Sequence, residues 1–286
     1  MNSHPQQCES AILAGAWDTL FAEASAWVAA HTDVGPADPR AHFGQNVVYL
    51  LRGQFADAWK AHAACLEAEA DIAIVKAWVE DLLARHQDNS HAQLVTGLFL
   101  AQSGQSEQSV QSYKDAARLN PQSAYPHYFL AQIHVRASHL EMAIKEYKEA
   151  VRLDPAYVPA RTNLGVAYQE QGRLEMAIKE YREVIKLCPS DPVAHANLGC
   201  ALAEQGKMEP ALQSYKDALK LNPKDAEVHL PWAACMKRGG VWTWRRGVIE
   251  TPSKPIRTSA PRIPRWAGWR SRSINYNLRR SSSAVR

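Results

Sequence analysis

From residue 90 onward, small, aromatic and proline residues return at a constant spacing. Three columns repeat every 34 residues: small residues (Gly97, Ala131, Gly165, Gly199), tyrosines (Tyr113, Tyr147, Tyr181, Tyr215) and prolines (Pro121, Pro155, Pro189, Pro223). Small residues let two helices approach closely, and each proline ends a helix because its ring and missing N–H cannot continue it. The pattern predicts four helix–turn–helix units across residues 90–223, at about 90–123, 124–157, 158–191 and 192–225.

Local signals agree with these units. Gly104, Gly172 and Gly206 lie between the predicted paired helices, where a positive φ is inexpensive only for glycine. Asp191 followed by Pro192 is typical of an N-cap residue and a proline in the first helical turn. The tyrosine column is expected to fill the space between one unit and the next.

The third unit shows the motif most fully, with Leu164-Gly165 and Tyr168, then Ala177 and Tyr181, and a closing proline. This motif resembles that of the tetratricopeptide repeat family. The resemblance implies an all-α fold, a right-handed α-solenoid of stacked antiparallel helix pairs. The first unit departs from the motif, with threonine for leucine and serine for alanine at two consensus positions.

The region upstream, residues 1–89, is predicted to be helical, and we interpret it as degenerate repeats or a helical cap. Helices are expected near 14–30, 41–52, 56–69 and 72–86. Two phases of the repeat compete there. Gly53 and Ala58 fit a unit that starts near Pro39, whereas Trp59 fits one that starts near Ala56. We favour the second phase, because it joins the later repeats without a gap.

The repeat fails after Pro223. A fifth unit begins, but Pro231 falls inside its first helix, where it costs about 3 kcal/mol. Residues 226–238 are therefore an incomplete fifth repeat or a capping helix, and residues 239–286 an irregular, disordered tail. Three readings of the tail remain open: a basic arm for nucleic acid or acidic membrane, a segment that orders on a partner, and out-of-frame translation, which the abrupt change favours.

Charge separates the tail from the body. Residues 239–286 hold ten Arg and one Lys against Glu250, which gives +10 within a chain of net charge +4, so the body carries 4 − 10 = −6. An acidic body does not suggest nucleic-acid binding, and contact with nucleic acid or an acidic surface is open only to the tail.

The five widely spaced cysteines lack a C-x-x-C motif and indicate a reducing compartment, so a cytoplasmic location is expected. The start of the chain shows no secretory signal, and no apolar run is long enough to span a membrane.

The sequence carries no motif for nucleotide binding, metallohydrolase or serine hydrolase chemistry. His127, His195 and His229 share one repeat column, and we interpret them as packing residues at the place of the family tryptophan rather than as metal ligands. We therefore expect no catalytic residue, no metal and no cofactor.

The family architecture implies that the first helix of each unit lines the concave side of the solenoid. Its inward residues are then expected to form a peptide-binding groove, to which Thr162, Val166, Ala196 and Cys200 also contribute. Asn163 and Asn197 recur in N-L-G triplets, and in the family such amides hold the backbone of an extended peptide. An equally weighted reading leaves both asparagines exposed and idle. The groove residues are Asn163, Asn197, Tyr125, Tyr128, Gln132, Arg136, Gln169, Glu170 and Glu204.

These observations predict a non-catalytic scaffold that binds a peptide or protein segment. Thr162, Val166 and Ala196 occupy places where a carboxylate clamp for chaperone C-termini needs Lys and Asn, so we argue against a heat-shock co-chaperone. The alternative is the targeting arm of a truncated larger enzyme, such as a glycosyltransferase whose catalytic domain is missing. The basic tail carries a third possibility, binding to nucleic acid or a membrane surface.

Overall fold

The computed structural model describes residues 3–31, 38–67, 72–223, 243–245 and 248–250. The described residues up to Pro159 belong to one compact unit, here unit 1, and those from Ala160 belong to a second, unit 2. Apart from two three-residue strands, every regular element in these ranges is a helix, so the predicted all-α class is confirmed.

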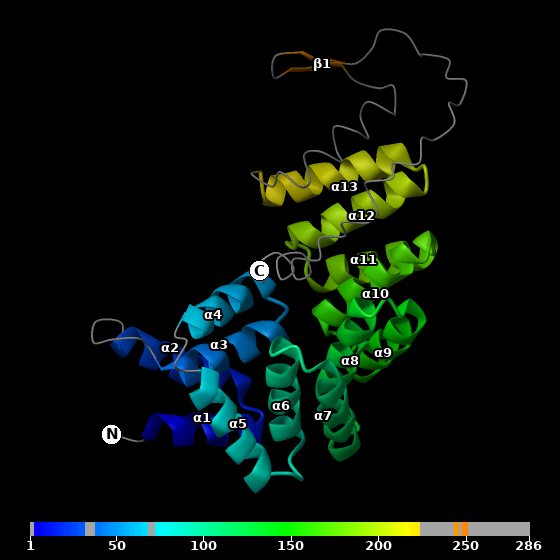
Figure 1. Ribbon diagram of the computed structural model, residues 1–286. Helices are drawn as coiled ribbons and strands as arrows, with labels where there is room; N and C mark the ends of the chain where they lie inside the picture. The colour runs from blue at the N-terminus through cyan, green and yellow to red at the C-terminus, as the bar shows by residue number, and fades with distance from the viewer. Residues whose placement is uncertain (1–2, 32–37, 68–71, 224–242, 246–247, 251–286) are drawn as a thin grey trace, which may run out of the picture. The chain divides into compact units, whose positions relative to one another are not determined.

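Figure 1 labels the elements in chain order. The helices that lie within unit 1 are α1 Ser3–Ala14, α2 Trp17–His31, α3 Pro39–Leu51, α4 Phe55–Glu67, α5 Ile72–Arg85, α6 Ser90–Gln102, α7 Ser106–Leu119, α8 Ala124–Arg136 and α9 Leu140–Leu153. Helix α10 Val158–Glu170 begins at the end of unit 1 and lies mostly in unit 2, followed by α11 Leu174–Leu187, α12 Pro192–Glu204 and α13 Met208–Leu221.

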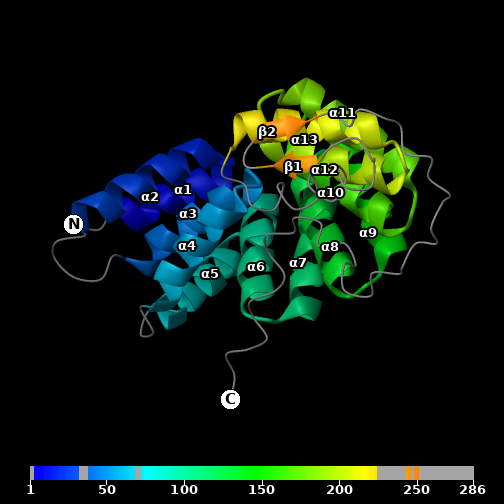
Figure 2. The same cartoon turned by 90° about the horizontal axis from the view of Figure 1, so that it is seen from above.

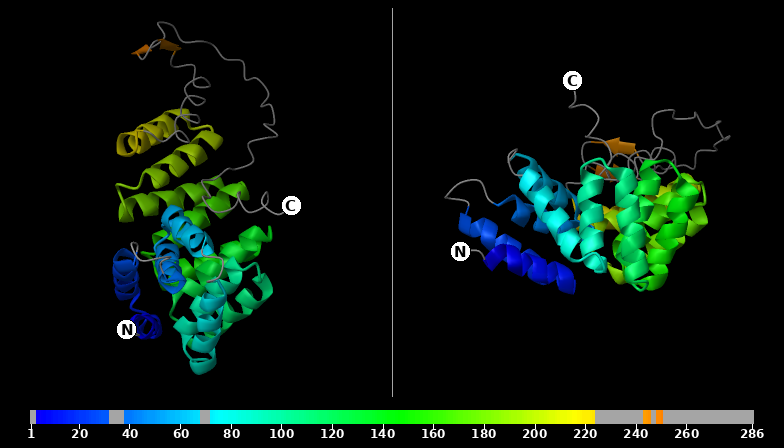
Figure 3. Two further views of the ribbon diagram at one scale, coloured as in Figure 1. Left: turned by 60° about the vertical axis from the view of Figure 1, so that its left-hand side comes forward. Right: turned by 60° about the horizontal axis from the view of Figure 1, so that its bottom comes forward.

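Consecutive helices pack as pairs within each unit. In unit 1, α6 packs against α7 and α8 against α9, and the members of each pair lie side by side (Figure 2). In unit 2, α12 packs against α13, and the two are the yellow-green and yellow helices in the left view of Figure 3. Stacked pairs of this kind are the architecture that the 34-residue period predicts.

A glycine and a tyrosine hold three of the four repeat pairs together. A Cβ atom built on Gly165 of α10 would lie 2.6 Å from Cε1 of Tyr181 on α11, and one on Gly199 of α12 would lie 2.7 Å from Cδ1 of Tyr215 on α13. Gly97 and Tyr113 repeat the contact in unit 1, at 2.5 Å. The tyrosine rings are buried, so they fill a space inside each pair that any Cβ would close.

The tyrosine column also reaches between neighbouring pairs, as the sequence suggested. Tyr113 stacks on Phe129 of the next pair, with ring centroids 5.6 Å apart. The second unit of the repeat carries Ala131 in place of glycine, and its Tyr147 ring lies 6.0 Å from Tyr128 in a tilted arrangement. Tyr113 therefore packs both inside its own pair and against the next one.

The turns within pairs use positive φ angles. Gly104, Gly172 and Gly206 have φ of 78°, 75° and 86°, which confirms the glycine turns. The turn between α8 and α9 has no glycine, and Ser138 adopts φ of 61° there. A left-handed conformation costs a non-glycine residue about 1–2 kcal/mol. Asp191 caps α12 as predicted, since its carboxylate accepts from Val193 N at 2.9 Å with Pro192 at the helix start.

The N-terminal helices correct the preferred repeat phase. Helix α3 packs against α4 across a tight turn at Gly53, where φ is 71°. Asp38 caps α3 just before Pro39, as Asp191 and Pro192 do for α12. Asn46 Nδ2 donates to the Ala58 carbonyl oxygen at 2.6 Å and ties the two helices. The pair therefore begins at Pro39, and the phase starting near Ala56 is wrong for these helices.

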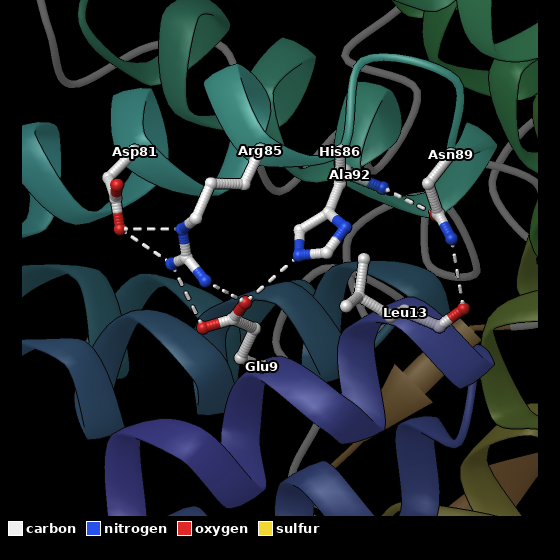
Figure 4. A network of polar contacts seen from close by, with 7 residues as sticks. All are labelled: Glu9, Leu13, Asp81, Arg85, His86, Asn89 and Ala92. Carbon is white, nitrogen blue, oxygen red and sulfur yellow. Dashed lines mark hydrogen bonds and ion pairs between the residues drawn. The ribbon is translucent and has the colours of Figure 1, made fainter.

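Helix α1 is fastened to the start of the repeats by polar contacts (Figure 4). Glu9 accepts hydrogen bonds from Arg85 at 2.6 and 3.1 Å, and its Oε1 lies 3.1 Å from His86 Nε2. Asn89 caps α6 through His91 N and also donates to the Leu13 carbonyl oxygen at 3.2 Å. These bonds connect residues separated by 76 or 77 positions, so they fix the N-terminal segment inside unit 1.

Part of the predicted irregular tail has regular structure. Residues Thr243–Arg245 (β1) and Val248–Glu250 (β2) form an antiparallel pair, with Trp244 opposite Ile249. The predicted fifth repeat or capping helix at 226–238 and the rest of the tail lie outside the described residues.

The glycine–tyrosine contact predicts the effect of Gly165→Ala. Alanine improves helix propensity by about 1 kcal/mol. The new Cβ would meet a ring that is 0% exposed, and overpacking of this kind costs about 1–3 kcal/mol. We expect net destabilisation in urea unfolding followed by circular dichroism. Ala131→Gly is the matched change, and it should cost the propensity difference together with the loss of one buried methyl group. Equal or greater stability of Gly165→Ala would contradict the packing account.

The turn at Ser138 predicts a reciprocal pair of effects. Ser138→Gly removes the cost of a left-handed serine and should raise the free energy of unfolding by up to about 1 kcal/mol. Gly172→Ser places serine at the same position of the next pair and should lower it by a similar amount. Thermal unfolding of both variants checks the two signs. A lower midpoint for Ser138→Gly would show that the serine side chain contributes more than its backbone costs.

Candidate protein-binding surface

The first helices of unit 2 bring five of the predicted groove residues onto one surface. Asn163, Gln169 and Glu170 lie on α10, and Asn197 and Glu204 lie on α12. We call the surface made by these residues the α10–α12 face. Asn197 and Glu204 are seven residues apart, so they share one side of their helix. The two helices meet at this face, where Gln169 Nε2 donates to Glu204 Oε1 at 2.6 Å.

A hydrogen-bond relay links the face to the core of the pair. The Tyr181 hydroxyl on α11 donates to Gln169 Oε1 at 3.1 Å. Burial raises the pKa of Tyr181 well above its usual value, and the nearby Cys200, Glu204 and Glu170 raise it further, so this hydroxyl stays protonated. Gln169 therefore has its oxygen and its nitrogen both engaged. Its role is to position Glu204, which the sequence did not reveal.

Glu204 presents a carboxylate at the end of α12. Its side chain is exposed, yet partial desolvation of the carboxylate raises its pKa, and the hydrogen bond from Gln169 opposes that shift. Glu170 occupies the equivalent last position of α10 and is half-buried. The α10–α12 face therefore carries two acidic residues at the same repeat position.

The two asparagines differ in their surroundings. Asn197 is only 5% exposed, and no hydrogen bond to its side-chain amide is formed within the described ranges. The polar atoms of the Asn197 side chain are not completely buried, so the amide keeps access to water. Asn163 is half-buried at the equivalent position of α10. A nearly buried amide that lacks a partner is an uncommon arrangement in a folded protein.

An ion pair holds the far side of α10. Arg161 donates to Glu180 on α11 at 2.9 Å, and both side chains are largely buried. His127 and Glu146 form the same contact in unit 1, where His127 Nδ1 lies 2.7 Å from Glu146 Oε2. This is the repeat column that held the candidate histidine ligands. Within the described part of the chain, no group of three or more His, Cys, Asp or Glu residues is arranged to hold a metal ion.

The remaining predicted residues lie on α8 in unit 1 and behave differently. Tyr128 is 0% exposed and packs edge-on against Phe129 and Tyr157, with centroids 5.0 and 5.1 Å away. A ligand side chain cannot reach a ring packed in this way, so Tyr128 is a core residue in this structure. Tyr125 is half-buried against Tyr157, and burial raises its pKa.

Gln132 is half-buried and Arg136 is exposed. Both keep accessible surface on α8, and neither makes a hydrogen bond or ion pair with another described residue. A ligand can therefore still contact these two residues, whereas it cannot reach Tyr128.

The N-terminal helices cover the corresponding surface of α6. Gln102 occupies the same repeat position as Glu170 and Glu204, and its Nε2 donates to Asn46 Oδ1 of α3 at 2.5 Å. Phe43 of α3 packs edge-on against Phe99 of α6, with centroids 5.8 Å apart. The first helix of the first repeat is therefore occupied by this chain's own residues. The 34-residue pattern holds no signal for such a contact, because Asn46 and Gln102 are 56 positions apart.

Hydrophobicity gives no indication of a membrane span in the described residues. None of the helices there is both long enough and apolar enough to cross a bilayer.

Comparisons with known proteins agree with this architecture. Family models described as TPR repeat match residues 139–172 and 168–206, and models described as tetratricopeptide repeat match 75–124 and 192–225. No curated protein matches the chain in sequence.

Solved structures show the same fold at low identity. A crystal structure of MamA is 24% identical with a TM-score of 0.50, covering 56% of this chain and 94% of MamA. The APC/C hetero-tetramer Cut9–Hcn1 is 18% identical with a TM-score of 0.53, over 84% of this chain and 43% of that one. PilF of Pseudomonas aeruginosa is 16% identical with a TM-score of 0.53, over 71% and 84%.

The repeat columns, the paired helices with glycine–tyrosine contacts and the matching family models lead to one assignment. The chain is a member of the tetratricopeptide repeat family.

Proposed function

We propose that this protein is a non-catalytic interaction scaffold, and that it binds an extended segment of a partner protein on the α10–α12 face. The tetratricopeptide fold supports the general role, since its stacked helix pairs present extended surfaces to other proteins. The observation that carries the more specific proposal is Asn197, whose nearly buried amide lacks a hydrogen-bond partner in the described ranges.

A side-chain amide suits a peptide backbone. It donates to a carbonyl oxygen and accepts from an N–H, so one asparagine can satisfy both groups of an extended residue. The Asn197 amide is nearly buried and has no protein partner in the described ranges, so a bound backbone would supply hydrogen bonds in place of water. Asn163 is a second asparagine one repeat earlier, at the equivalent position of α10. Recognition through these amides would tolerate many sequences.

The proposal places recognition on unit 2 rather than on α6. The first-helix surface of α6 is occupied by Phe43 and Asn46 of this chain, and Tyr128 of α8 is sealed in the core. In unit 2, Asn163 and Glu170 keep partial exposure and Glu204 is exposed. A cytoplasmic location belongs to the same proposal, supported by Cys65, Cys188 and Cys200, which form no disulfide bonds within the described residues.

Selection from a random peptide library on the immobilised full chain tests the proposal. We expect peptides to be recovered, and the recovered peptide to bind Asn197→Ala about five- to thirtyfold more weakly, because two hydrogen bonds are lost. Isothermal titration measures the difference, and circular dichroism checks that the variant is folded.

The matched control is Gln213→Ala. Gln213 is an exposed amide on α13 whose contacts are to Asp217 of the same helix, at 3.1 and 3.2 Å. Its replacement should leave affinity unchanged. Failure to recover any peptide would remove the peptide-binding proposal, whereas equal affinity of wild type and Asn197→Ala would remove the asparagine mechanism.

A further inference from the structure

We infer that the segment bound on the α10–α12 face carries a lysine or arginine side chain, and that this cation pairs with Glu204. The inference rests on the proposed function and names the chemistry of its partner. Three observations support it: the charges at the helix ends of unit 2, the hydrogen bonds that hold Glu204, and the amide of Asn197.

The first and second helices of unit 2 carry different charges at their C-terminal ends. A helix C-terminus carries partial negative charge, so cations there are stabilising and anions are not. The second helices follow this rule, with Lys186 in the last turn of α11 and Lys220 in that of α13. Helices α10 and α12 break it. Each ends on a glutamate, Glu170 or Glu204, and neither has a basic residue in its last turn.

Other helices show that the break is specific. In unit 1, α8 has the same repeat position occupied by Arg136, with His134 also in its last turn. Among the first helices of the four 34-residue repeats, a glutamate at the last position therefore occurs only in α10 and α12, the two that form the proposed binding face. A cation supplied by a ligand would remove the conflict at α12, because it would meet both the carboxylate and the negative end of the helix.

Hydrogen bonds hold the Glu204 carboxylate in place and leave part of it available to a ligand. Gln169 Nε2 donates to Oε1 of Glu204, and Gln169 is itself fixed by the Tyr181 hydroxyl. A carboxylate offers about four lone-pair sites, so this single bond leaves capacity for a second donor. Within the described ranges, Glu204 forms no ion pair. Its side chain is exposed, and its raised pKa reflects partial desolvation of a charge that lacks a cation.

The third argument is the neighbouring amide. Asn197 lies two helical turns before Glu204, which places the two about 10 Å apart along α12. That distance matches about three residues of extended chain. One short segment can therefore place its backbone at Asn197 and a long basic side chain at Glu204. The nearly buried amide and the exposed carboxylate are independent observations on one side of one helix.

Three ion pairs in unit 2 match charges away from Glu204. Arg161 pairs with Glu180, Lys186 with Glu183 and Lys220 with Asp217. These pairs join α10 to α11 or lie within α11 and α13, and none of them involves Glu204. The unit therefore offers no other described cation within ion-pair distance of this carboxylate.

The experiment compares the peptides that the full chain selects from a random library. Wild type should return peptides enriched in Lys or Arg at one position, and Glu204→Gln should return peptides without that enrichment. Glu209→Gln is the control, since Glu209 is an exposed glutamate in the first turn of α13, and it should preserve the enrichment.

Titration of one selected peptide completes the test. Replacing its enriched basic residue by glutamine should weaken binding to wild type roughly tenfold and binding to Glu204→Gln hardly at all. The wild-type affinity should also fall as salt rises. Equal losses in the two proteins, or selected peptides without a basic residue, would overturn the inference.

The outcomes keep the two proposals apart. If peptides are recovered and Asn197→Ala weakens them, but no basic residue is enriched, the scaffold proposal stands and the cation inference fails. If no peptide is recovered at all, the proposed function fails first. Glutamine at position 204 can still accept from Gln169, so the relay to Tyr181 is preserved and a loss of fold is not expected.

Discussion

The arrangement of unit 2 depends on a tyrosine ring that occupies the space where a glycine lacks a side chain. Tyr181 lies against Gly165, and Tyr215 lies against Gly199, each at a distance that excludes a Cβ atom. This contact sets how closely the first and second helices of a pair approach. Because one side of the first helix is fixed in this way, its other side is presented outward. The same Tyr181 donates to Gln169, so the core contact also determines where Glu204 is held.

Much of this fold could be predicted from the sequence, because its main contacts join residues within one repeat or between neighbouring repeats. The small-residue, tyrosine and proline columns identify the helix pairs, and the glycine turns and the Asp191 cap follow from local backbone chemistry. Ser138 was missed because a serine gives no signal for a left-handed turn. The N-terminal phase was wrong because Gly53 sets the α3–α4 turn, whereas Trp59 matched the consensus by type alone.

The binding residues were less predictable. Repeat position correctly groups Asn163, Gln169, Glu170, Asn197 and Glu204 on the first helices of unit 2. It does not reveal that Gln169 serves as a link between Tyr181 and Glu204, nor that Tyr128 is sealed by Tyr157. It also gives no sign that Phe43 and Asn46 of α3 contact α6, because these contacts join residues that do not follow the 34-residue spacing. Residues of one column therefore have different roles, and their long-range neighbours decide which.

The central claim is that the α10–α12 face binds an extended protein segment. Amide hydrogen exchange on the full chain, with and without a selected peptide, tests it most directly, because exchange reports which helices a ligand stabilises. The account predicts that bound peptide slows exchange in α10 and α12 more than in the second helices α11 and α13. Protection confined to α11 and α13, or to the helices of unit 1, would contradict it.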